Sequence, residues 1–192
     1  MKVLTAMKFS VNLLLCLAAV AAVLLRFVPA PLHNFSAMGA LAVLCGVHAR
    51  TPLQALALPL AARLITDVLL QIQSGYGFYS TMLFDYAAYA LIVVAGRCLR
   101  PSGLLQGTAA GLLSAVTFFF ISNFGVWCLP FNGQYLYPQT LQGLQQCLTM
   151  GLPFARGTLI SDLLLTPIFL AAAAALLAPR TQPAPGVTET LK

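Results

Sequence analysis

Ionisable residues inside apolar segments are the first candidates for chemistry in this sequence. Asp67 shares an apolar run with Arg63, four residues before it, while Asp85 lies in the next run and Asp162 in the last. A charged side chain at the centre of a membrane helix costs about 2.5–3.5 kcal/mol on insertion scales, so such residues pair, lie near a surface or line an aqueous cavity. The chain has only four acidic residues. Three of them in apolar runs are therefore the strongest functional signal in the sequence.

The composition places these residues in a membrane protein. Hydrophobic residues make up 60% of the 192 positions and charged residues only 7%, whereas a soluble domain carries roughly 25% charged residues. A chain in lipid must satisfy every backbone hydrogen bond internally, which restricts it to helices or closed barrels. The runs here are long and rich in Leu and Ala rather than alternating, so they predict an all-α integral membrane protein.

The apolar runs divide one domain, residues 1–178, into six predicted transmembrane helices. A short helix is expected at about 139–152 on the outer side, and the polar tail at 179–192 is expected to be disordered and cytoplasmic. The predicted membrane helices lie at about 9–28, 35–48, 52–72, 81–98, 104–123 and 155–178.

The basic residues predict the orientation of the bundle. Lys and Arg collect in cytoplasmic segments near membrane helices. With both termini inside, Arg26 and Arg156 lie near the outer ends, and the remaining terminal basic residues lie at the inner ends. Those inner residues are Lys2, Lys8, Arg50, Arg97, Arg100, Arg180 and Lys192. The net charge of +6 is thus explained by orientation, and no basic cluster interleaved with aromatics suggests nucleic acid binding.

This orientation gathers acids, arginines and aromatics in one outer layer. Two interpretations of the charges stay open: structural ion pairs such as Arg63–Asp67 and Arg156–Asp162, or groups that contact a substrate. The aromatic residues either form an interfacial belt or wall a pocket for a flat, polar organic ligand. The candidate substrate-binding residues are Asn34, Arg63, Asp67, Asp85, Tyr86, Asn123, Trp127, Tyr137, Arg156 and Asp162.

Catalytic and metal motifs give little support to an enzyme. The sequence contains no HExxH, GxSxG or phosphate-binding loop, so no catalytic residues and no cofactor are predicted. Cys128 and Cys147 lie in one connecting region, where a disulfide or a metal ligand role stays open. Small residues at Ala18 and Ala22 favour close helix packing, either within the bundle or against a partner protein.

Several ordered segments carry a family resemblance. They read RFVPAPLHNFSAMGALAVLCG from Arg26, then PLAARLITD, FFFISNFGVW, LYPQTLQGL and GLPFARGTLISDLLL. Together they resemble an uncharacterised family of bacterial membrane proteins assigned to transport, over about Arg26 to Phe169. That family looks like the substrate-binding S-components of energy-coupling-factor (ECF) vitamin transporters. Leu32-His33 departs from the Pro-Pro of the usual form of that loop.

The resemblance implies an S-component-like six-helix bundle in the bacterial inner (cytoplasmic) membrane, with both termini cytoplasmic and a pocket at the outer face. It also implies docking of small-residue faces such as Ala18 and Ala22 on a shared transmembrane coupling protein driven by ATPases. Some relatives act alone, including cobalamin carriers with a cobalt-ligating Cys, a part that Cys128, Cys147 or His33 would take here.

We therefore expect a substrate-binding membrane transport protein, not an enzyme. Its cargo would be a small polar nutrient, vitamin-like, such as cobalamin or another ring-bearing compound. Two other classes stay open. One is a structural or assembly subunit of a membrane complex, and the other is a small membrane enzyme that uses the outer carboxylates.

Overall fold

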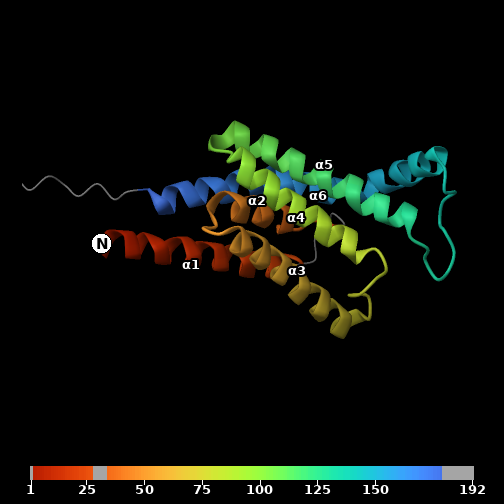
Figure 1. Cartoon of the computed structure of the whole chain (residues 1–192), viewed down its shortest axis with the longest axis horizontal. Helices are drawn as coiled ribbons and strands as arrows, with labels where there is room; N and C mark the ends of the chain where they lie inside the picture. The colour runs from red at the N-terminus through yellow and green to blue at the C-terminus, as the bar shows by residue number, and fades with distance from the viewer. Residues whose placement is uncertain (1, 28–33, 179–192) are drawn as a thin grey trace, which may run out of the picture.

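The computed structural model describes residues 2–27 and 34–178, with side chains described from Val11 onward. This part of the chain is all-helical (Figure 1), as the sequence predicts. Its six helices are α1 (Lys2–Leu25), α2 (Met38–His48), α3 (Pro52–Ser74), α4 (Met82–Leu99), α5 (Gly103–Cys128) and α6 (Leu141–Leu177). The predicted tail at 179–192 lies outside the described residues.

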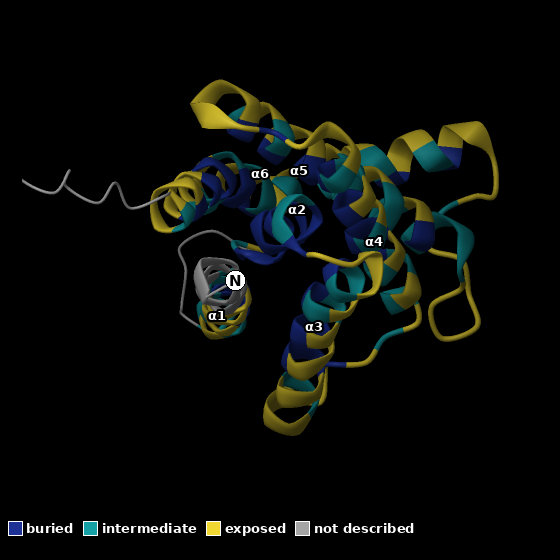
Figure 2. Ribbon diagram, turned by 60° about the vertical axis from the view of Figure 1, so that its left-hand side comes forward, coloured by how far each residue is buried: buried dark blue, intermediate teal, exposed yellow. Residues whose placement is uncertain are grey.

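Helix α2 forms the centre of the bundle. Every residue from Met38 to Gly46 is buried, and Figure 2 shows α2 as a dark blue core enclosed by the other helices. The helix contacts all five of the others. A helix that is apolar on all sides has no solvent-facing stripe and is stable only when surrounded.

Four helices, α3 to α6, are long and apolar enough to cross a membrane, so the chain is a multi-pass membrane protein. The prediction of six transmembrane helices is therefore too high for the described residues. Helix α2 has 11 residues and is roughly 16 Å long at 1.5 Å per residue, about half of a 30 Å hydrocarbon core. The described side chains of α1 cover only a short apolar stretch, Val11–Leu25.

Helix α6 corrects a second boundary. The predicted outer helix at 139–152 and the predicted last helix at 155–178 are one helix of 37 residues that continues through Pro153. A proline removes one helical hydrogen bond, but α6 packs along α5 more extensively than any other helix pair packs. Near the proline, Cys147 Sγ donates to the Asn123 carbonyl oxygen at 3.3 Å. The two helices lie so close here that a Cβ on Gly151 would be 2.4 Å from Asn123 Oδ1.

Helix α5 also extends beyond its predicted end at Asn123, reaching Cys128. Asn123 is a polar residue at the end of the apolar run. In the structure, Asn123 Nδ2 donates to the Phe119 carbonyl at 2.8 Å. The polar side chain thus has its hydrogen-bond partner within its own helix, and the helix continues to Cys128.

The small residues of α1 and α5 pack inside the bundle. Ala18 and Ala22 are 9% and 0% exposed and belong to the hydrophobic core. Their small size lets α1 approach its own neighbours, which is the internal packing that the sequence offered as one of two alternatives; docking on a partner stays a prediction. Gly111 acts likewise on α5, where a Cβ would lie 2.2 Å from the Asp162 carbonyl oxygen of α6.

Candidate functional site

A buried ion network is centred on Arg63 in α3. The Arg63 Nε donates to Asp67 Oδ2 at 3.0 Å, one helical turn further on. Its Nη2 lies 3.5 Å from Asp85 Oδ2 in α4. Arg63 and Asp67 are 2% and 1% exposed. The predicted Arg63–Asp67 pair is therefore present, and Asp85 extends it to a neighbouring helix.

Two tyrosines complete the network. Arg63 Nη2 donates to the Tyr79 hydroxyl at 2.6 Å, and that hydroxyl in turn donates to Asp85 Oδ2. The Tyr86 hydroxyl donates to Asp67 Oδ2 at 2.9 Å. Burial raises the pKa of Tyr79 above its ordinary value, so its hydroxyl keeps the proton that it donates to Asp85.

The connection between α3 and α4 places Tyr79 against Arg63. Helix α3 ends at Gly75, whose φ of 75° is in the left-handed region that glycine tolerates best. The Gln71 side-chain oxygen then accepts hydrogen bonds from the backbone N–H of Gly77 and of Phe78, at 3.0 and 3.1 Å. Gly77 lies so close to α3 that a Cβ would be 1.9 Å from the Asp67 carbonyl oxygen. The loop is thereby folded back, and Tyr79 reaches the arginine.

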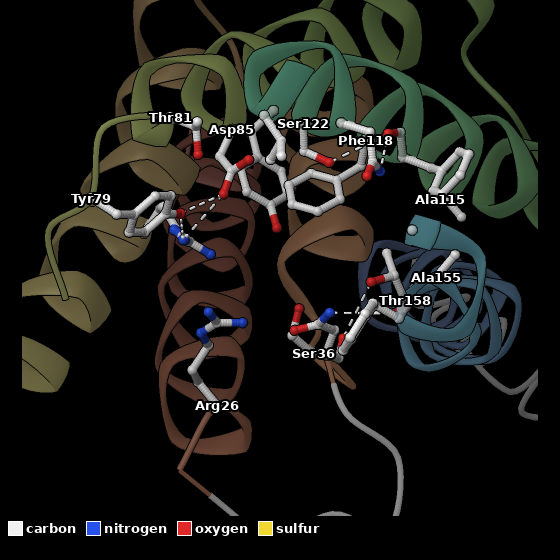
Figure 3. A pocket seen from close by; sticks show the side chains of 18 residues that line it. Arg26, Ser36, Tyr79, Thr81, Asp85, Ala115, Phe118, Ser122, Ala155 and Thr158 are labelled. Carbon is white, nitrogen blue, oxygen red and sulfur yellow. Dashed lines mark hydrogen bonds and ion pairs between the residues drawn. The ribbon is translucent and has the colours of Figure 1, made fainter. Parts of the chain in front are cut away.

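The network borders a cavity of about 370 Å³. Figure 3 shows Arg26 pointing into it from the end of α1, toward Tyr79 and Asp85, with Phe118 and Ser122 of α5 along one wall. Ser36 and Thr158 lie at another side. A cavity of this size is within the usual range for small-molecule sites. The full lining is Arg26, Asn34, Ser36, Arg63, Tyr79, Thr81, Asp85, Tyr89, Ala115, Phe118, Phe119, Ser122, Asn123, Val126, Gly151, Phe154, Ala155 and Thr158.

Several polar groups of the lining lack a full set of partners. Arg26 Nε is buried without a hydrogen bond, and Arg26 forms no salt bridge within residues 2–27 and 34–178. The hydroxyls of Ser36 and Thr81 donate no hydrogen bond to the described residues, although both line the cavity. Polar groups converging on one apolar-walled space are the usual arrangement of a binding site.

Four of the predicted site residues line this cavity: Asn34, Arg63, Asp85 and Asn123. Asp67 and Tyr86 lie behind the lining and join it through the ion network. The other four predicted residues are not in the lining: Trp127, Tyr137, Arg156 and Asp162.

Asp162 lies in a separate buried position between α2, α5 and α6. Ser114 Oγ donates to its Oδ2 at 2.7 Å, and a Cβ on Gly39 would lie 2.2 Å from the same oxygen. The suggested Arg156–Asp162 pair is not formed, and Arg156 is exposed. Residues six apart on a helix point to different faces, because each residue turns the helix by about 100°.

Trp127 and Tyr137 hold the connection between α5 and α6. Trp127 Nε1 donates to the Pro138 carbonyl at 2.9 Å, and Gln139 Nε2 donates to the Trp127 carbonyl at 2.6 Å and to the Tyr137 carbonyl at 3.3 Å. These bonds close the loop on itself. Trp127, in the last turn of α5, and Tyr137, in the loop, thus lie outside the cavity lining.

Sequence reasoning missed several lining residues that a spacing argument would have found. Ala115, Phe118, Phe119, Ser122 and Val126 line the cavity from α5, at intervals of three and four residues that repeat on one helical face. In α4, Tyr89 follows Asp85 by four residues and faces the same cavity. The pattern of basic residues places Arg26 near an outer helix end, but the predicted substrate-binding residues do not include it.

The cysteines show no sign of a linked or metal-bound pair. Cys128 and Cys147 are both free thiols, so the alternative of a disulfide is not realised. No group of three His, Cys, Asp or Glu side chains able to hold a metal occurs in the part of the chain that the structure describes. His33 lies outside that part.

Comparison with known proteins gives one match. The model of a family of unknown function (DUF6580) matches residues 7–185, nearly the whole chain. No curated protein and no solved structure matches the chain.

Proposed function

The chain belongs to the DUF6580 family, and we propose that it is a membrane protein that binds a small, polar, ring-bearing molecule in its cavity for uptake. The observation that carries this proposal is the cavity of about 370 Å³ lined by buried charges and aromatic side chains. Charged residues within membrane segments are expensive and usually mark substrate or ion pathways.

The distribution of arginines supports an outward-facing cavity. Arg50, Arg97 and Arg100 lie at the ends of α2, α4 and α5 that are remote from the cavity. Arg97 is fixed there by a 3.0 Å hydrogen bond from Nη1 to the Ala49 carbonyl. Figure 1 shows the start of α1 and the end of α6 at this same end of the bundle. By the positive-inside rule this end is cytoplasmic, which gives the N-in, C-in orientation.

The resemblance to ECF S-components supports the finer part of the proposal. It favours a vitamin-like cargo, a location in the bacterial inner membrane, and coupling to a transmembrane protein with ATPases. The sequence has no phosphate-binding loop of its own. Energy for accumulation would therefore come from such a partner or from an ion gradient.

The decisive experiment is native mass spectrometry of the protein purified in lipids of its own host, with identification of any bound small molecule. We compare the wild type with Asp85→Asn and with Asp162→Asn. Both changes remove one carboxylate from a membrane helix, but only Asp85 lines the cavity. We expect a bound compound in the wild type and in Asp162→Asn, and its loss in Asp85→Asn.

Other results would favour the other two functions. An empty wild type that co-purifies with further membrane subunits would favour a structural or assembly role. Conversion of a bound compound by the isolated protein would favour an enzyme that uses the carboxylates. Equal retention of the compound by Asp85→Asn would show that the cavity is not the binding site.

A further inference from the structure

Two side chains of opposite charge, Asp85 and Arg26, line the cavity from different sides. Each has a polar atom without a hydrogen-bond partner among the described residues. Resting on the proposed function, we propose that the cavity's ligand is dipolar. The ligand carries an anionic group for Arg26, an ammonium or similar N–H donor for Asp85, and a ring between the two.

The acidic side follows from the charges of the network. One guanidinium, Arg63, faces two carboxylates, Asp67 and Asp85. Both contacts to Asp85, from Arg63 and from Tyr79, reach its Oδ2. Its Oδ1 has no hydrogen bond to the described residues, although the side chain lines the cavity. Asp67 Oδ1 is also buried without a partner. The network thus has an excess of negative charge and of acceptors, which a cationic donor would balance.

The basic side follows from Arg26. The three acids of the described chain are Asp67, Asp85 and Asp162, and none lies within 4.0 Å of the Arg26 guanidinium. Its Nε–H is buried and unbonded, so no group among the described residues accepts from this donor. A guanidinium presents parallel N–H groups that match a carboxylate or phosphate oxygen pair. An anionic group on the ligand would give the Arg26 guanidinium a partner of opposite charge.

Aromatic side chains also line the cavity. Tyr89 and Phe118 lie with ring centroids 5.0 Å apart, and Phe119 and Phe154 also line the space. Stacking on these faces suits a planar ring. The volume suits a single-ring compound with one group at each end. The competing explanation is that Arg26 itself neutralises the excess negative charge of the network across the cavity. The ligand would then bind equally well with one charge or with none.

Three ring compounds of similar shape separate these explanations. The dipolar probe is 4-(aminomethyl)benzoate. The two singly charged probes are 4-methylbenzoate, which is anionic, and 4-methylbenzylammonium, which is cationic. Affinity is measured by equilibrium dialysis against the full-length protein in lipid nanodiscs, with empty nanodiscs subtracted. A charge-assisted hydrogen bond contributes enough that the dipolar probe should bind about tenfold more tightly than either of the others.

Variants assign each charge of the probe to its residue. In Arg26→Gln, the affinity for 4-(aminomethyl)benzoate should fall to that for 4-methylbenzylammonium. In Asp85→Asn, it should fall to that for 4-methylbenzoate. The matched control is Arg156→Gln, which removes an exposed arginine that does not line the cavity and should leave all three affinities unchanged. Circular dichroism of each variant checks that it is folded, and Arg26→Lys, which keeps the charge, should retain most of the preference for the dipolar probe.

The outcomes distinguish this inference from the proposed function. If the dipolar probe does not bind, or binds no more tightly than a singly charged one, the inference is refuted. If mass spectrometry instead finds a native ligand with one charge or none in the cavity, the proposed function stands and the dipolar inference fails. If the wild type is empty and none of the three probes binds, both fail.

Discussion

Replacement of Arg63 by Gln tests the ion network most directly. Among the described residues, the change removes the only cation within 4.0 Å of Asp67 and Asp85 and also the donor to Tyr79. The Arg63 and Asp67 side chains are 3% and 1% exposed, so water screens the loss very little. Breaking a buried ion pair by removing one partner costs about 3–5 kcal/mol. We expect the free energy of unfolding to fall by about that amount.

The assay is denaturant unfolding of wild type and Arg63→Gln in the same detergent, followed by circular dichroism. The cost comes from leaving two carboxylates without a cation, so removing their charge should restore stability. We therefore expect the triple variant Arg63→Gln, Asp67→Asn, Asp85→Asn to be more stable than the single variant by about 2 kcal/mol or more.

Two results would contradict this reasoning. If Arg63→Gln unfolds at the denaturant concentration of the wild type, the guanidinium is not part of a buried network. If the triple variant is less stable than the single one, the loss arises from the hydrogen bonds of the carboxylates rather than from unbalanced charge.

Three further changes test other parts of the structure. Tyr79→Phe removes a hydroxyl that both accepts and donates in the network and should lower the free energy of unfolding by about 1–3 kcal/mol; the control, Tyr76→Phe, alters a side chain that is 85% exposed and should change nothing in the same unfolding assay. Gly39→Ala places a Cβ 2.2 Å from an Asp162 oxygen and should cost about 1–3 kcal/mol by overpacking; unfolding at wild-type denaturant concentration would show that α2 and α6 are less tightly packed. Trp127→Phe removes the 2.9 Å hydrogen bond that closes the α5–α6 loop and should speed hydrogen exchange in that loop without weakening 4-(aminomethyl)benzoate binding; a loss of binding would place this residue in the site.

The sequence predicted the all-helical fold because the evidence for helices is local, although it predicted six membrane spans where four of the described helices are long and apolar enough. Long apolar runs and few charges are enough to indicate helices in lipid. Their ends were harder to predict, because a polar residue or a proline does not show how its backbone is satisfied. Asn123 looked like an end but bonds to its own helix, and Pro153 looked like a break but lies in a helix held along α5.

The candidate site could be predicted only in part. Residue number gives depth in the membrane, since a helix rises 1.5 Å per residue. It does not say which face of the helix meets which neighbour. Asp85 and Asp162 were both assigned to the outer layer, yet one lines the cavity and the other is enclosed beside Gly39 and Ser114. The rotation of each helix depends on packing partners distant in sequence.

Asp85 belongs to both the ion network and the cavity wall, and this links stability to binding. A compound that bonds to Asp85 binds only the folded protein, so it stabilises the fold by an amount that rises with its concentration. Asp85→Asn should therefore lose part of the stability and also the stabilisation by ligand. Asp162→Asn disturbs a position that does not line the cavity, so it should change the stability and leave the stabilisation by ligand intact. The two aspartates, both predicted to lie in the outer layer, are separated by this difference.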